Sequence, residues 1–155
     1  MLWVAPVAFA CQLLVIHALD GTALRVALPL VHVLLLPFLF ANLRLFGVRL
    51  VMLGLALNLL VISLNGGLMP VEQGAVAAVG KHTNVDLSVG EHIAGSKNVL
   101  LERQDVRLRA LSDVILLPLP RPYTRAVSAG DLVIVVGIGA VLASLALARR
   151  PGAQR

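Results

Sequence analysis

Apolar residues along this chain gather in four long runs, separated by short polar breaks in the first half and by one long mixed segment in the second. A helix needs about 20 predominantly apolar residues to cross a bilayer. The four runs approach that length, at residues 2–19, 23–46, 50–69 and 132–148. We therefore predict an all-α membrane fold with four transmembrane helices, forming a single integral membrane domain over residues 1–155.

The segment at residues 70–130 differs from the helical runs because polar, charged and apolar residues are mixed in it. Residues 85–89 and 106–109 alternate between apolar and polar side chains, which is typical of strands. Residues 71–80 are small and apolar, which favours a short interfacial helix. We predict a small, partly β extracytoplasmic subdomain between helices three and four. It should rest on the helix bundle, because it is too short for a large core of its own.

Composition and charge favour a membrane protein over a nucleic-acid binder. Hydrophobic residues make up 59% of the chain and charged residues 14%, whereas soluble domains are nearer 45–50% and about 25%. The formal net charge is +5, but the basic residues do not form one patch with interleaved aromatic side chains. We therefore expect membrane lipids, and no nucleic acid, as partners.

The distribution of arginines predicts how the helices are oriented. With both termini inside, the cytoplasmic segments carry no acidic residue and five arginines: Arg44, Arg49, Arg149, Arg150 and Arg155. Basic residues in short loops favour the cytoplasmic side. We therefore expect a multi-pass protein of the inner (cytoplasmic) membrane with both termini in the cytoplasm and residues 70–130 outside.

Helix three carries a stripe of small and amide side chains. Gly54, Asn58 and Asn65 recur at spacings of four and seven, which places them on one helix face. A small residue and two amides on one stripe suit close helix packing with interhelical hydrogen bonds.

The end of helix three is marked by residues 65–70, which read Asn-Gly-Gly-Leu-Met-Pro. Gly66 and Gly67 permit positive φ, and Pro70 disfavours helical backbone at the residue before it. We predict a structural turn that brings Asn65 toward the Asp131 end of helix four.

Two aspartates, Asp113 and Asp131, flank the point where the chain returns to the membrane. A pair of carboxylates can share one proton, so that one activates water while the other protonates the substrate. Alternatively, Asp131 caps helix four in a capping box with Ser128, and Asp113 caps a turn or pairs with Arg109 or Arg121. The spacing alone leaves both interpretations open and favours the structural one.

Other polar residues are weaker candidates. Four residues of the long loop are metal ligands by type but match no closed ligand set: His82, Asp86, Glu91 and His92. His17 and His32 lie in helices one and two at different depths, so we expect interhelical hydrogen bonds rather than haem ligation. The sequence predicts no cofactor and no metal site.

Residues 111–139 resemble the C-terminal part of bacterial lipoprotein signal peptidases, which are membrane aspartic proteases. That family has an aspartate followed by apolar residues, an interfacial stretch, and then an Asn-x-Ala-Asp-x-x-Ile motif at the start of its fourth helix. Here Asp113-Val114-Ile115 and residues 131–134 stand in those places. The resemblance implies Asp113 and Asp131 as catalytic residues. In a hydrolase of this kind we expect Asn58 and Asn65 to orient substrate or backbone.

The chain departs from the peptidase family at three motifs. Ser128 replaces the asparagine of the fourth-helix motif, and residues 65–70 stand where the family has Gly-Asn-x-x-Asp-Arg. The Asn-x-Gly-Ala signature after helix one is absent.

A larger part of the chain, roughly residues 50–140, resembles a bacterial family of small four-helix membrane proteins of unknown function. Three motifs carry this resemblance: NGG-x-MP at residues 65–70, Leu-x-Asp-x-Ile-x-Pro-x-Pro at residues 111–120, and Ser-x-Gly-Asp at residues 128–131. The second motif has an extra residue before Pro118. This resemblance implies the architecture but no activity.

Two functions of different classes are compatible with these observations. The first is a membrane aspartic hydrolase with Asp113 and Asp131 as its dyad, acting on a membrane-anchored or lipidated substrate. The second is a non-catalytic assembly factor, or a subunit of a larger complex, that binds a partner membrane protein. A close approach of the two carboxylates would favour the first.

Overall fold

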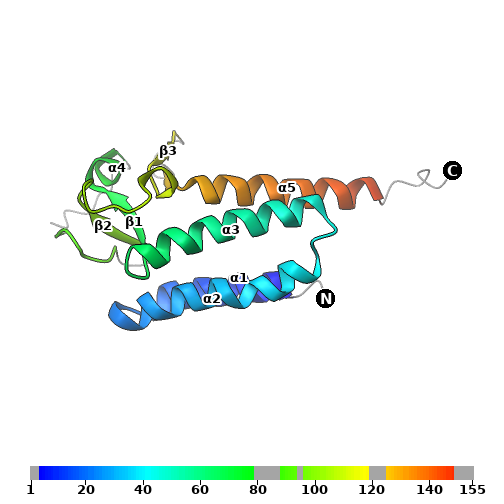
Figure 1. Cartoon of the computed structure of the whole chain (residues 1–155), viewed down its shortest axis with the longest axis horizontal. Coiled ribbons are helices and arrows are strands. Elements are labelled where there is room, and N and C mark those ends of the chain that lie inside the picture. The colour runs from blue at the N-terminus through cyan, green and yellow to red at the C-terminus, as the bar shows by residue number, and fades with distance from the viewer. Residues whose placement is uncertain (1–3, 79–87, 94–95, 119–124, 149–155) are drawn as a thin grey trace.

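The computed structural model describes residues 4–78, 88–93, 96–118 and 125–148. Long helices run side by side, and a small strand-bearing region covers one end of them (Figure 1). The long helices are α1 (Val4–Ala18), α2 (Gly21–Ala41), α3 (Phe46–Leu64) and α5 (Ala129–Ala148). The predicted mostly helical fold with a small strand-containing region is confirmed.

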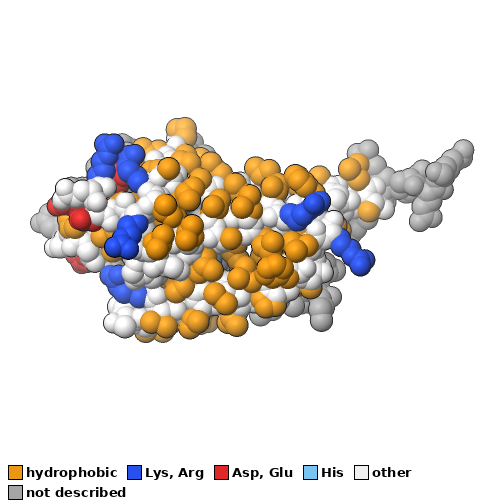
Figure 2. Space-filling view, in the orientation of Figure 1, with side chains coloured by type: hydrophobic (Ala, Val, Ile, Leu, Met, Phe, Trp, Pro, Cys, Tyr) orange, Lys and Arg blue, Asp and Glu red, His pale blue; other side chains and the backbone are white. Residues whose placement is uncertain are grey.

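Three of these helices are long and apolar enough to cross a membrane: α2 with 21 residues, α3 with 19 and α5 with 20. Helix α1 has 15 residues, which is shorter than the usual membrane span of about 20. Apolar side chains cover the helical part of the face shown in Figure 2, and charged side chains lie toward its ends. The helices therefore have the surface expected of a membrane protein.

The helix boundaries differ from the prediction between α2 and α3. Helix α2 ends at Ala41 and not near 46, and α3 begins at Phe46 and not at 50. The side chain of Asn42 donates a hydrogen bond to the Phe38 carbonyl, 2.7 Å away. This bond satisfies one of the free carbonyls of the last helical turn, so the chain leaves the helix earlier than its apolar pattern suggests.

Helices α3 and α5 are antiparallel and pack on each other through glycines (Figure 1). Gly54 faces Gly130, and seven residues away on each helix Gly47 faces Gly137. A Cβ on Gly54 would lie 2.5 Å from the Gly130 carbonyl oxygen. Small residues let helix backbones approach closely in membranes, and here they bring α3 against the start of α5.

The strands form two small sheets, each of two strands. β1 (Met69–Glu72) pairs in parallel with β2 (Asn98–Leu101), and β3 (Ile115–Leu117) pairs antiparallel with β4 (Arg125–Val127). The short helix α4 (Gln73–Ala78) follows β1, within the range predicted for an interfacial helix.

The predicted strand at residues 106–109 is wrong. This stretch turns into a short 3-10 helix, η1 (Arg109–Leu111), and Leu108 takes a left-handed conformation with φ of 54°. The side chain of Asn65 binds both the N–H and the C=O of Arg107 and so holds the backbone of this stretch in place. The other predicted strand, at residues 85–89, falls mostly outside the described residues.

The turn after α3 adopts the predicted glycine conformations. Gly66 has φ of 77° and Gly67 has φ of 88°. The Gly67 N–H bonds back to the Ile62 carbonyl at 2.9 Å, and the Arg25 side chain donates to the Gly66 carbonyl at 3.2 Å. The turn therefore fixes both the end of α3 and the neighbouring end of α2.

Replacing Gly67 by Ala should destabilise the protein far more than replacing Gly90. Both glycines have positive φ, but a Cβ on Gly67 would overlap the Arg25 backbone, whereas a Cβ on Gly90 would meet no atom within 4 Å. We expect Gly90→Ala to cost about 1–2 kcal/mol from backbone strain alone. Gly67→Ala should cost about 3 kcal/mol or more, because overpacking adds to the strain. Thermal unfolding of both variants in detergent measures the difference; equal costs would contradict the close approach of α2.

Candidate functional site

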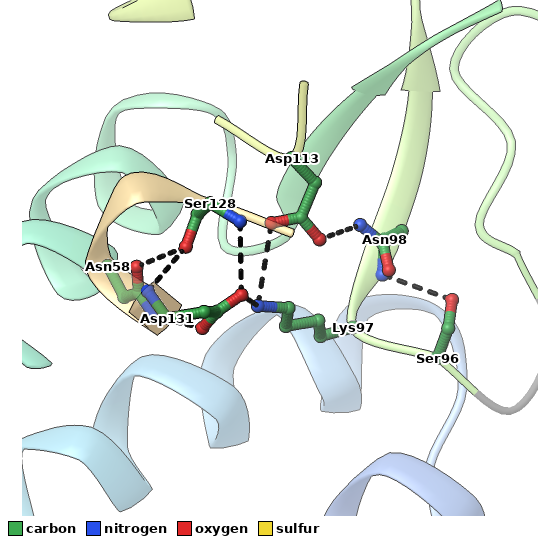
Figure 3. A network of polar contacts seen from close by, with 7 residues as sticks. All are labelled: Asn58, Ser96, Lys97, Asn98, Asp113, Ser128 and Asp131. Carbon is green, nitrogen blue, oxygen red and sulfur yellow. Dashed lines mark hydrogen bonds and ion pairs between the residues drawn. The ribbon is translucent and has the colours of Figure 1, made fainter. Parts of the chain in front are cut away.

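One lysine side chain lies between the two aspartates singled out in the sequence (Figure 3). Lys97 Nζ is 2.8 Å from Asp131 Oδ2 and 3.6 Å from Asp113 Oδ1. The two carboxylates therefore share one ammonium group. Three further side chains, those of Asn58, Asn98 and Ser128, bind these carboxylates or each other. We call the six residues together the polar cluster: Asn58, Lys97, Asn98, Asp113, Ser128 and Asp131.

Asp131 is surrounded by hydrogen-bond donors. Its Oδ1 accepts a bond from Asn58 Nδ2 at 2.7 Å, and its Oδ2 accepts one from the Ser128 N–H at 3.2 Å in addition to Lys97. The Asp131 N–H in turn donates to Ser128 Oγ at 2.9 Å. Ser128 and Asp131 thus make the reciprocal bonds of a capping box at the start of α5, and all the partners favour the ionised carboxylate.

Asp113 has a different environment, because it is almost fully buried, at 1% exposure. Its Oδ2 accepts a hydrogen bond from Asn98 Nδ2 at 2.7 Å, while its Oδ1 has no hydrogen-bond partner among the described residues. Burial raises the pKa of Asp113 above the ordinary value of 3.8, and the charge of Lys97 and the bond from Asn98 offset that only in part. The protonated carboxyl is therefore favoured here relative to an exposed aspartate.

The close packing of α3 and α5 positions Asn58. Its side chain lies against Gly130, where a Cβ would overlap the amide oxygen. That oxygen accepts a bond from Ser128 Oγ at 2.9 Å, and the amide nitrogen donates to Asp131. Asn58 is 3% exposed and Ser128 is fully buried. Helix three therefore holds the first turn of helix α5 through one amide.

The strand-bearing region supplies the other half of the cluster. Lys97 directly precedes β2, and its carbonyl accepts a bond from the Met69 N–H of β1 at 2.8 Å. The next residue of β1, Pro70, accepts a bond from the Asp113 N–H at 3.3 Å. β1 thus aligns Lys97 and Asp113, which are distant in sequence.

Sequence reasoning missed Lys97 and Asn98. Neither belongs to a local motif, and a lone lysine in a polar loop is usually solvated. The signal that would have found them is the apolar run that follows, which becomes β2 and pairs with β1 in register. A parallel pairing between segments so far apart is not readable from local periodicity.

Asn65 does not reach Asp131, contrary to the prediction. Its side chain bonds to the Val61 carbonyl at 2.8 Å and to the backbone of Arg107. It therefore orients backbone just before η1. The reason is the glycine turn, which carries the chain past α5 toward the strands.

Of the two arginines expected as partners of Asp113, the structure describes one, and that arginine binds a different carboxylate. Arg109 forms an ion pair with Glu72 on β1, and Arg121 is outside the described residues. The expected pairing of Arg109 with Asp113 is not formed, because the Arg109 guanidinium is bound by the Glu72 carboxylate at the end of β1.

The histidines are also engaged differently from expectation. His17 and His32 each bind the carbonyl four residues earlier in their own helix, at 2.8 Å, and not a neighbouring helix. His92 binds the Ser96 carbonyl and faces Asp20, and Glu91 binds the Ser88 N–H. His82 and Asp86 lie outside the described residues.

The charged side chains of the cluster differ in how far they are exposed. The side chains of Lys97 and Asp131 retain 20% and 28% exposure, whereas that of Asp113 retains 2%. A small molecule such as water would meet Asp131 and Lys97 first. The arrangement offers a partly exposed carboxylate bound by several donors, a buried carboxyl of raised pKa, and an ammonium group close to both.

The chain belongs to the DUF5317 family, a family of unknown function, whose model matches residues 1–143. The search of curated proteins and the search of solved structures each found no match. Membership confirms the resemblance to a family of unknown function.

Gly130→Ala should break the polar cluster, whereas Gly139→Ala should not. The new methyl group at position 130 would displace the Asn58 side chain and with it the bonds to Ser128 and Asp131. We expect a cost of about 2–3 kcal/mol. A methyl group on Gly139 would meet no atom within 4 Å, so the same change on the same helix serves as the control. Thermal unfolding in detergent compares them, and similar stabilities would contradict the packing of α3 on α5.

The burial of Asp113 predicts a pH dependence of stability. Between 3.8 and its raised folded pKa, the folded protein keeps a proton that the unfolded chain has released. The free energy of unfolding should therefore fall as the pH rises through that window. Asp113→Asn removes this contribution, and the exposed Asp105→Asn should not. Unfolding curves between about pH 4 and pH 8 test this; parallel pH profiles for wild type and Asp113→Asn would refute it.

Proposed function

We propose that this protein is a membrane-embedded aspartic hydrolase whose acid–base pair is Asp113 and Asp131. The observation that supports it is that both carboxylates lie within 3.6 Å of one ammonium nitrogen, in a partly buried cluster at the start of an apolar helix. Residues whose environments favour different protonation states are typical of an acid and a base in one site.

The two carboxylates would divide the work of hydrolysis. Asp131, bound by donors and partly exposed, would take a proton from a water molecule as its oxygen attacks a carbonyl carbon. Asp113, whose pKa is raised by burial, would give its proton to the carbonyl oxygen and so complete the addition. The proton held by Asp131 would then pass to the leaving group as the scissile bond breaks, and Asp113 would recover its own from the collapsing intermediate.

The proposed hydrolysis depends on where the Lys97 side chain lies. In the described conformation its ammonium occupies the space between the carboxylates, where water and substrate would have to bind. Hydrolysis requires the side chain to withdraw toward its exposed side. From there its charge would stabilise the negative charge that develops on the carbonyl oxygen before Asp113 has completed its proton transfer.

The proposal also includes the class of substrate and the orientation of the protein in the membrane. A site at the start of an apolar helix suits a membrane-anchored or lipidated substrate, whose scissile bond would be held near the bilayer surface. The arginines of the α2–α3 connection and the C-terminal segment favour a cytoplasmic location for both termini in the inner membrane. The polar cluster would then lie at the extracytoplasmic surface.

A non-catalytic role is the second candidate, and the position of Lys97 favours it. An ammonium bound by two carboxylates is also a structural clamp, joining β2 to α5 and to the segment before β3. In that case the protein would serve as an assembly factor or a subunit of a larger membrane complex. The clamp would hold the strand-bearing region in place for a partner membrane protein.

Matched substitutions separate the two candidates. If the pair is catalytic, Asp113→Asn and Asp131→Asn should each reduce hydrolysis by about 10²–10⁴-fold. The stability cost at position 131 should stay near 0.3–1 kcal/mol, roughly the value of a helix-terminal charge. The assay compares lipoprotein processing by gel mobility in cells with and without the protein, then in cells carrying each variant.

Two controls make the result decisive. Asp105→Asn makes the same chemical change at an exposed site and should keep full activity. Lys97→Met removes the clamp, so a structural role predicts that this variant and the two aspartate variants lose function in proportion to their loss of stability. Unchanged processing in cells lacking the protein, or full activity in either aspartate variant, would reject the hydrolase.

A further inference from the structure

The end of the bundle opposite the strand-bearing region carries exposed basic and apolar side chains together. Arg44, in the connection between α2 and α3, and Arg49, in the first turn of α3, are both exposed. Around them, Phe40 is 59% exposed, Leu45 41% and Phe46 62%. We call these five residues the basic corner.

No acidic side chain neutralises the basic corner. The sequence has no aspartate or glutamate between Asp20 and Glu72, and none after Asp131. In the described part of the chain, neither Arg44 nor Arg49 forms an ion pair; Arg49 lies over the Phe46 ring, 5.6 Å from its centre. On the face shown in Figure 2, red side chains occur only toward the strand-bearing end, while blue ones occur at both ends.

Helix length places the basic corner at a bilayer surface. Helix α3 has 19 residues and is therefore about 30 Å long, close to the thickness of the hydrocarbon core. Arg49 stands in its first turn, and Arg44 precedes it. The guanidinium groups are thus at the depth of lipid phosphates, and the neighbouring phenylalanine and leucine side chains are at the depth of the upper acyl chains.

We propose that the basic corner is a binding site for the headgroup of an anionic phospholipid. The phosphate is held by the guanidinium groups of Arg44 and Arg49, which can donate paired hydrogen bonds to phosphate oxygens. Phe40, Leu45 and Phe46 contact the acyl chains below it. This site is at the other end of the helices from the polar cluster and does not depend on the proposed hydrolase activity.

Lipid fits the basic corner better than an acidic protein segment does. The exposed side chains between and beside the arginines are aromatic or aliphatic, so an acidic segment in water would leave them unburied. A phospholipid satisfies both kinds of side chain at once, because its charge and its hydrocarbon are adjacent. The uncompensated charge also favours an anionic lipid over a zwitterionic one.

The test uses the full chain in nanodiscs made from a mixture of phosphatidylglycerol and phosphatidylcholine. Native mass spectrometry after release in neutral detergent gives the ratio of the two lipids that stay bound. We expect phosphatidylglycerol to be enriched roughly tenfold over its share in the disc, from about two basic contacts. Arg44→Gln with Arg49→Gln should abolish the enrichment, while Arg44→Lys with Arg49→Lys should retain only part of it, because lysine keeps the charge but not the paired hydrogen bonds.

The control removes the same charge from the other end of the molecule. Arg103→Gln with Arg107→Gln alters two exposed arginines near the strands and should leave the enrichment unchanged. Thermal unfolding in neutral detergent checks that each pair of substitutions leaves the fold intact. The proposal is overturned if wild type shows no enrichment, if the Gln pair at 44 and 49 keeps it, or if the control pair removes it equally.

Discussion

Close backbone contact between α3 and α5 is the constraint on which the polar cluster depends. Gly54 and Gly130 let the two helix backbones come so near that neither position has room for a Cβ. At that distance Asn58 reaches the first turn of α5 and binds both Ser128 and Asp131. A larger residue at either glycine would separate the helices, and Asp131 would lose its bond from Asn58.

The polar cluster holds one ammonium group for two carboxylates. Among the residues that the structure describes, one oxygen of the buried Asp113 has no hydrogen-bond partner. Buried ion pairs recover little net stability after desolvation, and apolar replacements of similar volume are often as good or better. The burial of Asp113 beside Lys97 therefore does not by itself indicate a gain in stability.

The sequence predicts the helices and the turn after α3 well, because both depend on local signals. Apolar length marks the helices, and paired glycines before a proline mark the turn at Gly66 and Gly67. Another local signal, the capping-box motif of Ser128 and Asp131, predicts the first turn of α5. Such local signals do not predict the position of Lys97, which follows from the pairing of β1 with β2. Nor do they predict that Asn65 binds the Arg107 backbone or that Arg109 binds Glu72, because these contacts join residues 42 and 37 positions apart. Side-chain contacts between segments so distant in sequence leave no periodic trace.

The parallel pairing of β1 and β2 also makes the strand-bearing region part of the site. Met69 of β1 binds the Lys97 carbonyl, and Pro70 binds the Asp113 N–H. Any shift of β1 relative to β2 would move the ammonium and the buried carboxylate with respect to each other. Asp131, in contrast, is fixed by α3 and α5. The distance between Lys97 and Asp131 is therefore set by how the strands rest on the helices, and a partner or substrate that moves the strands would change the charge balance at Asp131 directly.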